Sequence, residues 1–200
     1  MQQQTAASIE HQAAHHAEAI PHSQDNSKFG MWLFLASEIM FFTVLIAAFV
    51  LARFSHPEEH ALLNVPLTSL NTFLLLTSSF TVVRAIAAIQ AGNMVKFQRS
   101  LALTGVLGIL FFLIMMFEYT ELGHHGVTLS SGPFGMAFFT LTGFHGFHVL
   151  IGLVWLAVIF NKALNGAYTR TNHFGVEFWG LYWHFVDVVW IFIFTIVYLL

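Results

Sequence analysis

The chain has 200 residues, of which 57% are hydrophobic and 8% are charged. Soluble domains average about 45–50% apolar and about 25% charged residues, so a soluble globular fold of this length is excluded. The net charge of −3 with no basic cluster argues against nucleic-acid binding, and the lack of cysteine excludes disulfides, iron–sulfur clusters and attached c-type haem. Histidine is unusually frequent, with 12 residues against 7 Lys and Arg together. The composition predicts an integral membrane protein.

Residues 1–28 are polar and contain no apolar run, so they do not form a cleavable signal peptide. We interpret them as a flexible N-terminal tail. Four of the histidines lie in this tail, at positions His11, His15, His16 and His22. Metal binding by these side chains is an alternative, but histidines in a flexible tail are more often solvated.

Five apolar stretches follow, at residues 29–54, 66–90, 101–122, 132–160 and 176–200. Each is long enough to cross a hydrocarbon core of about 30 Å as a helix. Because an unpaired backbone is costly in lipid and no alternating strand pattern is visible, the spans must be helical. The predicted fold class is an all-α integral membrane protein. Residues 29–200 form one domain, a bundle of five transmembrane helices.

The distribution of Lys and Arg predicts the orientation of the bundle. The tail and the loops after the second and fourth spans carry five basic residues, at Lys28, Lys96, Arg99, Lys162 and Arg170. The opposite side carries only Arg53. Because basic residues are enriched on the inner side of membranes, the N-terminus is predicted to be cytoplasmic and the C-terminus periplasmic; in a mitochondrion the tail would face the matrix.

Ionisable side chains inside the spans cost at least about 2.5–3.5 kcal/mol each on insertion, so each requires an explanation. They are Glu38, Arg84, Glu118, His145, His148, Glu177, His184 and Asp187. The last two spans are antiparallel, which places His148 level with His184. The same register places His145 level with Asp187, and we expect one buried hydrogen-bonded cluster in which the carboxylate orients an imidazole. We interpret this cluster as a packing seam, in which polar contacts hold the last two helices together.

Two functional interpretations compete with a packing seam. One is a haem held between histidines of two helices. The other is a proton relay through Glu38, Glu118, Glu177 or Asp187, because a carboxylate inside the membrane suggests function by default. No phosphate-binding loop, HExxH motif or nucleophile elbow occurs, and no inverted repeat or broken helix indicates a secondary transporter.

Four segments together resemble subunit III of the haem–copper terminal oxidases, most closely that of the cytochrome c oxidases. They are residues 37–42 (SEIMFF), 71–79 (NTFLLLTSS), 142–149 (TGFHGFHV) and 182–190 (YWHFVDVVW), with 172–177 (NHFGVE) fitting as well. The resemblance covers essentially all of residues 29–200. The chain is most similar to the five-helix bacterial form of the family, which lacks the first two helices of the seven-helix members. In those members the two helices form one wall of a lipid-binding cleft.

The resemblance implies a subunit without its own cofactor or metal, because family members leave haem and copper to subunits I and II. It implies packing on subunit I, support of proton uptake there, and bound phospholipid. Glu38 falls on the family's buried helix carboxylate, and its intramembrane polar positions fall on His145, His148, His184 and Asp187. Lys162, His173 and Arg84 are the candidates for binding lipid head groups.

We therefore predict a non-catalytic accessory subunit of a proton-pumping oxidase that reduces O₂ to water in a bacterial cytoplasmic membrane. The Ser37-Glu38 pair favours cytochrome c as electron donor, and the donor would act on the complex rather than on this chain. Subunit III of a quinol oxidase is the alternative. Interpretations from other classes are a stand-alone transporter bundle and a di-histidine cytochrome b.

Overall fold

A computed structural model describes the backbone of residues 2–55 and 62–200 and the side chains of 26–54 and 62–200. Regular structure in these ranges is helical, without strands, so the predicted all-α class is confirmed. The helices are α1 (Gln2–Ser55), α3 (Val65–Gln90), α4 (Met94–His124), α5 (Pro133–Leu164) and α6 (Phe174–Phe194), and α6 continues into a π-helical turn, η1 (Thr195–Leu199). Five segments, the first being Asn26–Phe54 of α1, are long and apolar enough to cross a membrane.

The chain divides into two compact units, Met1–Glu38 and Ile39–Leu200. Within the first unit the backbone is helical from Gln2, where the sequence predicted a flexible tail. The difference has a local cause, since this segment is rich in Ala and Gln, which favour the helix. Its flexibility stays a prediction. The tail histidines, His11, His15, His16 and His22, lie outside the residues whose side chains are described.

The helices extend beyond the apolar stretches read from the sequence. Helix α4 begins at Met94 rather than at residue 101, because the Asn93 side chain caps it by accepting a hydrogen bond from the Lys96 backbone N–H at 3.0 Å. Asn64 caps α3 in the same way, accepting from the Leu67 N–H at 3.1 Å. Polar turns at helix ends carry no apolar signal, so hydropathy alone underestimates helix length.

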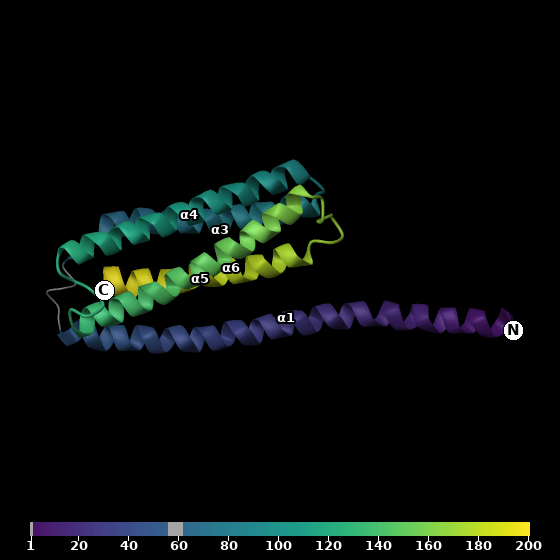
Figure 1. Ribbon diagram of the computed structural model, residues 1–200, viewed down its shortest axis with the longest axis horizontal. Coiled ribbons are helices and arrows are strands. Elements are labelled where there is room, and N and C mark those ends of the chain that lie inside the picture. Colours follow the sequence, from purple (N-terminus) through teal and green to yellow (C-terminus); the bar gives the residue numbers. More distant parts are fainter. Residues whose placement is uncertain (1, 56–61) are drawn as a thin grey trace. The chain divides into compact units, whose positions relative to one another are not determined.

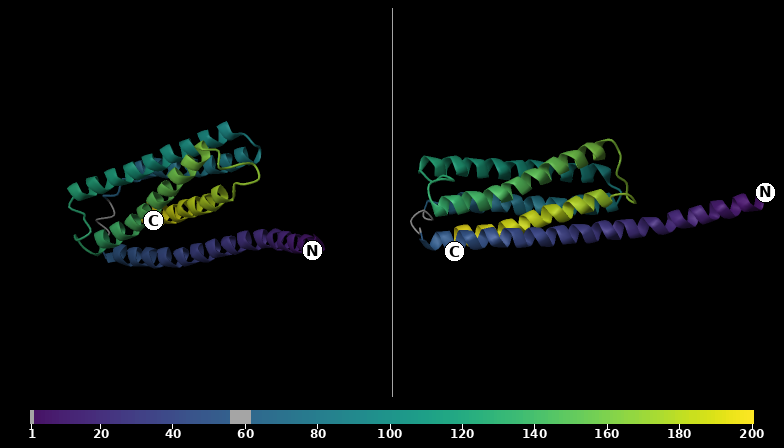
Figure 2. Two further views of the ribbon diagram at one scale, coloured as in Figure 1. Left: turned by 45° about the vertical axis from the view of Figure 1, so that its right-hand side comes forward. Right: turned by 60° about the horizontal axis from the view of Figure 1, so that its bottom comes forward.

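Helices α3, α4, α5 and α6 form a closed ring in which each lies beside the next and α6 returns to α3 (Figures 1 and 2). The part of α1 that belongs to the same unit packs against α5, with ring centroids of Phe41 and Phe144 5.0 Å apart. Near its end, Arg53 donates a hydrogen bond at 3.2 Å to the carbonyl of Ile196 in η1.

Helix α6 supplies the core of the ring. Its three tryptophans are fully buried, and each indole N–H has a partner. Trp179 donates to the Gly152 carbonyl at 3.0 Å. Trp183 donates to the Ser78 hydroxyl at 3.0 Å, and Trp190 donates to the Thr72 hydroxyl at 2.9 Å. An unpaired indole donor would be costly in a lipid environment, so these bonds fix α6 against α3 and α5.

Glycines on α4 and α5 create the space that the Trp183 ring occupies. A Cβ added at Gly152 would lie 2.8 Å from that ring, and one added at Gly108 would lie 2.9 Å from it. Real Cβ atoms essentially never approach so closely, so both glycines are required by the close packing of helices. The outer surface is apolar, with exposed side chains such as Leu113, Phe117 and Val154.

We expect Gly152→Ala to destabilise the bundle by about 1–3 kcal/mol, because Ser78 holds Trp183 from the far side and the ring cannot retreat. Thermal unfolding in detergent measures the loss. Gly123→Ala is the control, since no atom lies within 4 Å of the Cβ it would add. Equal melting temperatures for the two variants would contradict the proposed packing.

Candidate functional site

Polar side chains line the interior of the bundle, and most of them bond to a neighbouring helix or to their own backbone. The buried members of this polar seam are Thr68, Asn71, Thr72, Ser78, Thr81, Ser100, Thr104, Glu118, Thr142, His145, His148 and Asp187. Contacts between helices include the pair of hydroxyls of Thr81 and Thr104, 2.7 Å apart. The sequence identified the ionisable members of the seam but not its hydroxyl groups.

The predicted hydrogen-bonded cluster does not form between His145 and Asp187. His145 is fully buried, and among the described residues neither ring nitrogen has a hydrogen-bond partner. Its ring stacks instead on Trp190, with centroids 4.9 Å apart. Asp187 is 3% exposed, and neither carboxyl oxygen has a hydrogen-bond partner in the described part of the chain. The prediction was wrong because backbone level does not fix side-chain direction, and Trp190 occupies the space facing His145.

The other two histidines of the predicted cluster contact different helices. Nδ1 of His184 lies 2.5 Å from the hydroxyl of Ser79 on α3. The Asp187 carboxyl, one turn along α6 from His184, has no hydrogen bond to this hydroxyl.

His148 makes its contacts elsewhere. Its Nδ1–H donates to the Phe144 carbonyl at 2.7 Å, and its ring packs edge-on against Phe42 of α1. A haem held between His148 and His184 would need both rings to face a shared space. His184 faces α3 and His148 faces α1, so the geometry gives this alternative no support.

Glu118 is the buried carboxylate with the clearest structural task. Its Oε1 accepts a hydrogen bond from the Thr68 hydroxyl at 3.0 Å, and its Oε2 accepts one from the Tyr198 hydroxyl at 3.0 Å. The carboxylate therefore joins α3, α4 and η1 at one end of the bundle. The sequence placed Glu118 inside a span but missed Tyr198, because nothing in the spacing links positions 80 residues apart.

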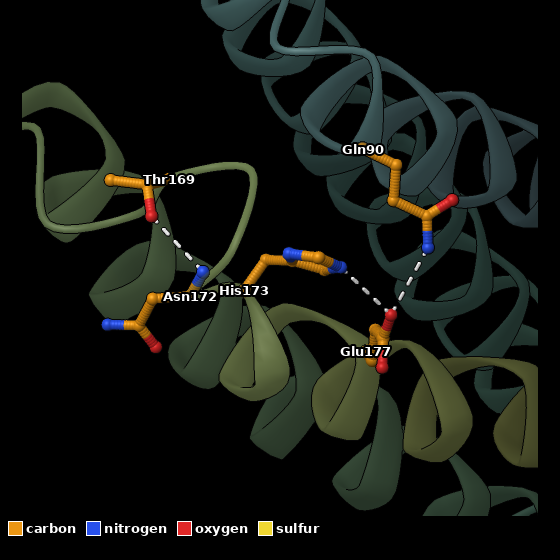
Figure 3. Close-up of polar contacts among 5 residues, drawn as sticks. All are labelled: Gln90, Thr169, Asn172, His173 and Glu177. Carbon is orange, nitrogen blue, oxygen red and sulfur yellow. Dashed lines mark hydrogen bonds and ion pairs between the residues drawn. The ribbon is translucent and has the colours of Figure 1, made fainter.

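Glu177 is not buried as predicted, since its side chain is 36% exposed in the first turn of α6. Figure 3 shows its contacts: Oε1 lies 3.1 Å from Nε2 of His173 and accepts a hydrogen bond from Gln90 at 3.2 Å. The adjacent loop is shaped by the Asn172 N–H, which donates to the Thr169 hydroxyl at 3.1 Å. The hydrogen bond from Gln90 therefore links α3 to α6 at this end, and a carboxylate in the first turn also stabilises α6 itself.

The predicted lipid-binding residues do not come together. His173 pairs with Glu177, whereas Lys162 and Arg84 are exposed on α5 and α3. Within the described ranges, no hydrogen bond or ion pair joins any two of the three, and their role stays a prediction. Glu38 belongs to the first compact unit, which ends at that residue, so its assignment as a buried carboxylate also stays a prediction. Among residues 26–54 and 62–200, no group of three His, Cys, Asp or Glu side chains could hold a metal ion.

The sequence is similar to those of known proteins over most of its length. The family model described as cytochrome c oxidase subunit III matches residues 5–200. Cytochrome c oxidase subunit 3 of Loxodonta africana is 38% identical over 196 residues, which covers 92% of this chain and 72% of the relative. The protein of the same name from Synechocystis sp. is 40% identical over 181 residues, which covers 88% of this chain and 76% of the relative.

We expect Glu118→Ala to lower the free energy of unfolding by about 1–3 kcal/mol, because it leaves the buried Tyr198 hydroxyl without its acceptor. Thr68 keeps a second acceptor, the Asn64 carbonyl. Glu121→Ala is the matched control, an exposed carboxylate on the same helix. Thermal unfolding in detergent compares them, and an equal effect of both substitutions would show that Glu118 does not tie the helices together.

Proposed function

Because the chain belongs to the cytochrome c oxidase subunit III family, we propose that it packs on subunits I and II of the oxidase as a non-catalytic subunit. Family membership, which rests on a match over residues 5–200, makes it an accessory subunit of a haem–copper oxidase. Its task in the proposal is to stabilise the complex and to support proton uptake by subunit I. Haem and copper belong to the partner subunits.

The contacts of the polar seam support a structural rather than a redox role. His184 and His148 each use Nδ1 within the bundle, and His145 is enclosed by the rings of Trp190 and Phe111. Glu118 is committed to two hydroxyls. These side chains serve packing between helices, which is the task expected of a subunit whose partners carry the chemistry.

Cytochrome c is the proposed electron donor of the complex. The matching family and the relatives from Loxodonta africana and Synechocystis sp. are described as cytochrome c oxidase subunits, which supports this donor over quinol. The composition of subunit II tests the choice, because a copper-binding dithiolate there would favour cytochrome c. A subunit II without those cysteines would favour the quinol oxidase alternative.

In the proposed orientation the N-terminus is cytoplasmic and the C-terminus periplasmic, in a bacterial inner membrane. Support comes from the basic residues of the α3–α4 and α5–α6 connections and the helix ends beside them. These are Lys96, Arg99, Lys162 and Arg170. Phospholipid at this side of the subunit is part of the proposal, with Lys162 and His173 as candidate contacts.

Purification in mild detergent tests the proposed assembly. We expect the chain to migrate with a large subunit that contains haem and copper, and the isolated chain to show no Soret absorbance. Migration without such a partner would favour a stand-alone transporter bundle. A haem spectrum from the isolated chain would favour a cytochrome b.

A second measurement tests the non-catalytic role. Ser78→Ala removes the acceptor of the buried Trp183 indole N–H, which we expect to cost about 1–3 kcal/mol and to lower the yield of intact complex. Turnover per haem in the complex that remains should be unchanged. Thr77→Ala is the control, since this neighbouring side chain is half-buried and, among the described residues, its hydroxyl bonds only to the Phe73 carbonyl of its own helix. A fall in turnover per haem without loss of complex would overturn the assignment.

A further inference from the structure

Two side chains inside the ring, Asn71 on α3 and His145 on α5, carry polar atoms that the rest of the bundle does not satisfy. Asn71 is 1% exposed and His145 is fully buried. Among the described residues, Oδ1 of Asn71 and both ring nitrogens of His145 have no hydrogen-bond partner. Buried polar groups normally have a partner in the protein or in an ordered water, so these atoms point to a bound group.

The orphaned atom of Asn71 is an acceptor, and its orientation is fixed. The Nδ2–H of the same amide donates to the Phe111 carbonyl on α4 at 3.2 Å. A carbonyl can accept only from the nitrogen side of the amide, so turning the group over would lose this bond. Oδ1 therefore stays on the other side of the amide and requires a donor.

His145 carries the complementary donor. A neutral imidazole has one N–H in either tautomer, and the charged form would be costly in a buried site without a counter-charge. The ring is held in place by stacking on Trp190, with centroids 4.9 Å apart, and the Trp190 indole is itself bonded to Thr72 at 2.9 Å. The imidazole therefore cannot move towards Asn71 without disturbing this stack.

Phe111 and Trp190 place the donor and the acceptor around the same part of the interior. The Phe111 carbonyl accepts from Asn71, and the Phe111 ring packs edge-on against His145, with centroids 5.9 Å apart. The same ring packs edge-on against Trp190, with centroids 4.9 Å apart, and the partner of Trp190, Thr72, directly follows Asn71 in α3. All four helices of the ring meet here, yet no direct hydrogen bond joins His145 to Asn71.

Water is the ligand that matches this pair of groups. One water molecule accepts from an N–H and donates to a carbonyl oxygen, so it connects two groups that do not reach each other directly. Buried waters in proteins occupy such positions between otherwise unpaired polar groups. A metal ion does not fit, since no three His, Cys, Asp or Glu side chains within residues 26–54 and 62–200 could hold one.

We propose that the interior of the ring binds a water molecule that accepts a hydrogen bond from the His145 N–H and donates one to Oδ1 of Asn71. Helices α3 and α5 lie opposite each other in the ring, with α4 and α6 between them. The water therefore connects two helices across the ring that are not adjacent in it. This inference goes beyond the proposed function, because it concerns only the interior of this chain.

Cryo-electron microscopy of the oxidase complex, at a resolution that shows ordered water, tests the proposal directly. We expect a density peak at about 2.7–3.2 Å from both Oδ1 of Asn71 and one ring nitrogen of His145. A direct hydrogen bond between the two side chains would overturn the proposal. So would the lack of a peak at this position in a map that resolves other waters inside the protein.

His145→Phe separates the bound water from the stacking role of the ring, because phenylalanine can stack on Trp190 but carries no N–H. We expect the density peak to disappear and the midpoint of thermal unfolding in detergent to fall by about 2–4 °C, as for the loss of one hydrogen-bonded connection in a chain of this length. An unchanged or higher midpoint would show that His145 acts by stacking alone. Thr142→Val is the control for the density, because Thr142 is buried on the same helix but bonds to Tyr119, and the peak should remain.

A double-mutant cycle tests whether the water couples the two side chains. If one water serves both, Asn71→Ala and His145→Phe together should lower the midpoint by clearly less than the sum of their separate shifts, because either substitution alone already breaks the connection. Additive shifts would overturn the proposal.

His145→Phe combined with Thr68→Val is the matched control cycle. Thr68 is a buried polar residue of the same helix as Asn71, but it bonds to Glu118 at one end of the bundle. The shifts of this second pair should add.

Discussion

The arrangement of the bundle depends on one constraint, the need to pair each buried N–H donor inside a solvent that offers no hydrogen bonds. The three indoles of α6 meet this need through Gly152, Ser78 and Thr72, on two different helices. Satisfying all three at once fixes both the rotation of α6 and its position along its axis. Apolar contacts alone would not fix this position, because an apolar side chain is solvated about equally well by a lipid tail and by a neighbouring leucine.

Some buried polar groups among the described residues lack such a partner. His145 and Asp187 are buried without hydrogen-bond partners among the described residues, whereas Glu118, at one end of the bundle, is fully bonded. Stacking on Trp190 gives His145 a packing role that does not need its nitrogens. The seam therefore contains both hydrogen-bonded connections between helices and enclosed polar groups whose contribution is packing.

Much of the fold could be predicted from the sequence, because five apolar stretches and the cost of an unpaired backbone in lipid leave only a helical bundle. The ionisable residues of the seam were also visible, since charges inside spans are rare. Their partners were not. Trp190 facing His145, Tyr198 reaching Glu118 and Ser79 reaching His184 depend on side-chain direction and on helix rotation, which hydropathy does not encode. Glu177 was misplaced because α6 begins before its apolar run.

The closure of the ring by α6 against α3 has a consequence for biosynthesis. Trp183 is synthesised after the residues that surround it. These are Gly108 and Gly152, which leave space for its ring, and Ser78, which accepts its indole N–H. Until α6 inserts, the hydroxyls of Ser78 and Thr72 have no indole N–H to accept from, and the interior of the ring is incomplete. Completion of the interior therefore depends on one late event, the insertion of the helix that carries the three tryptophans.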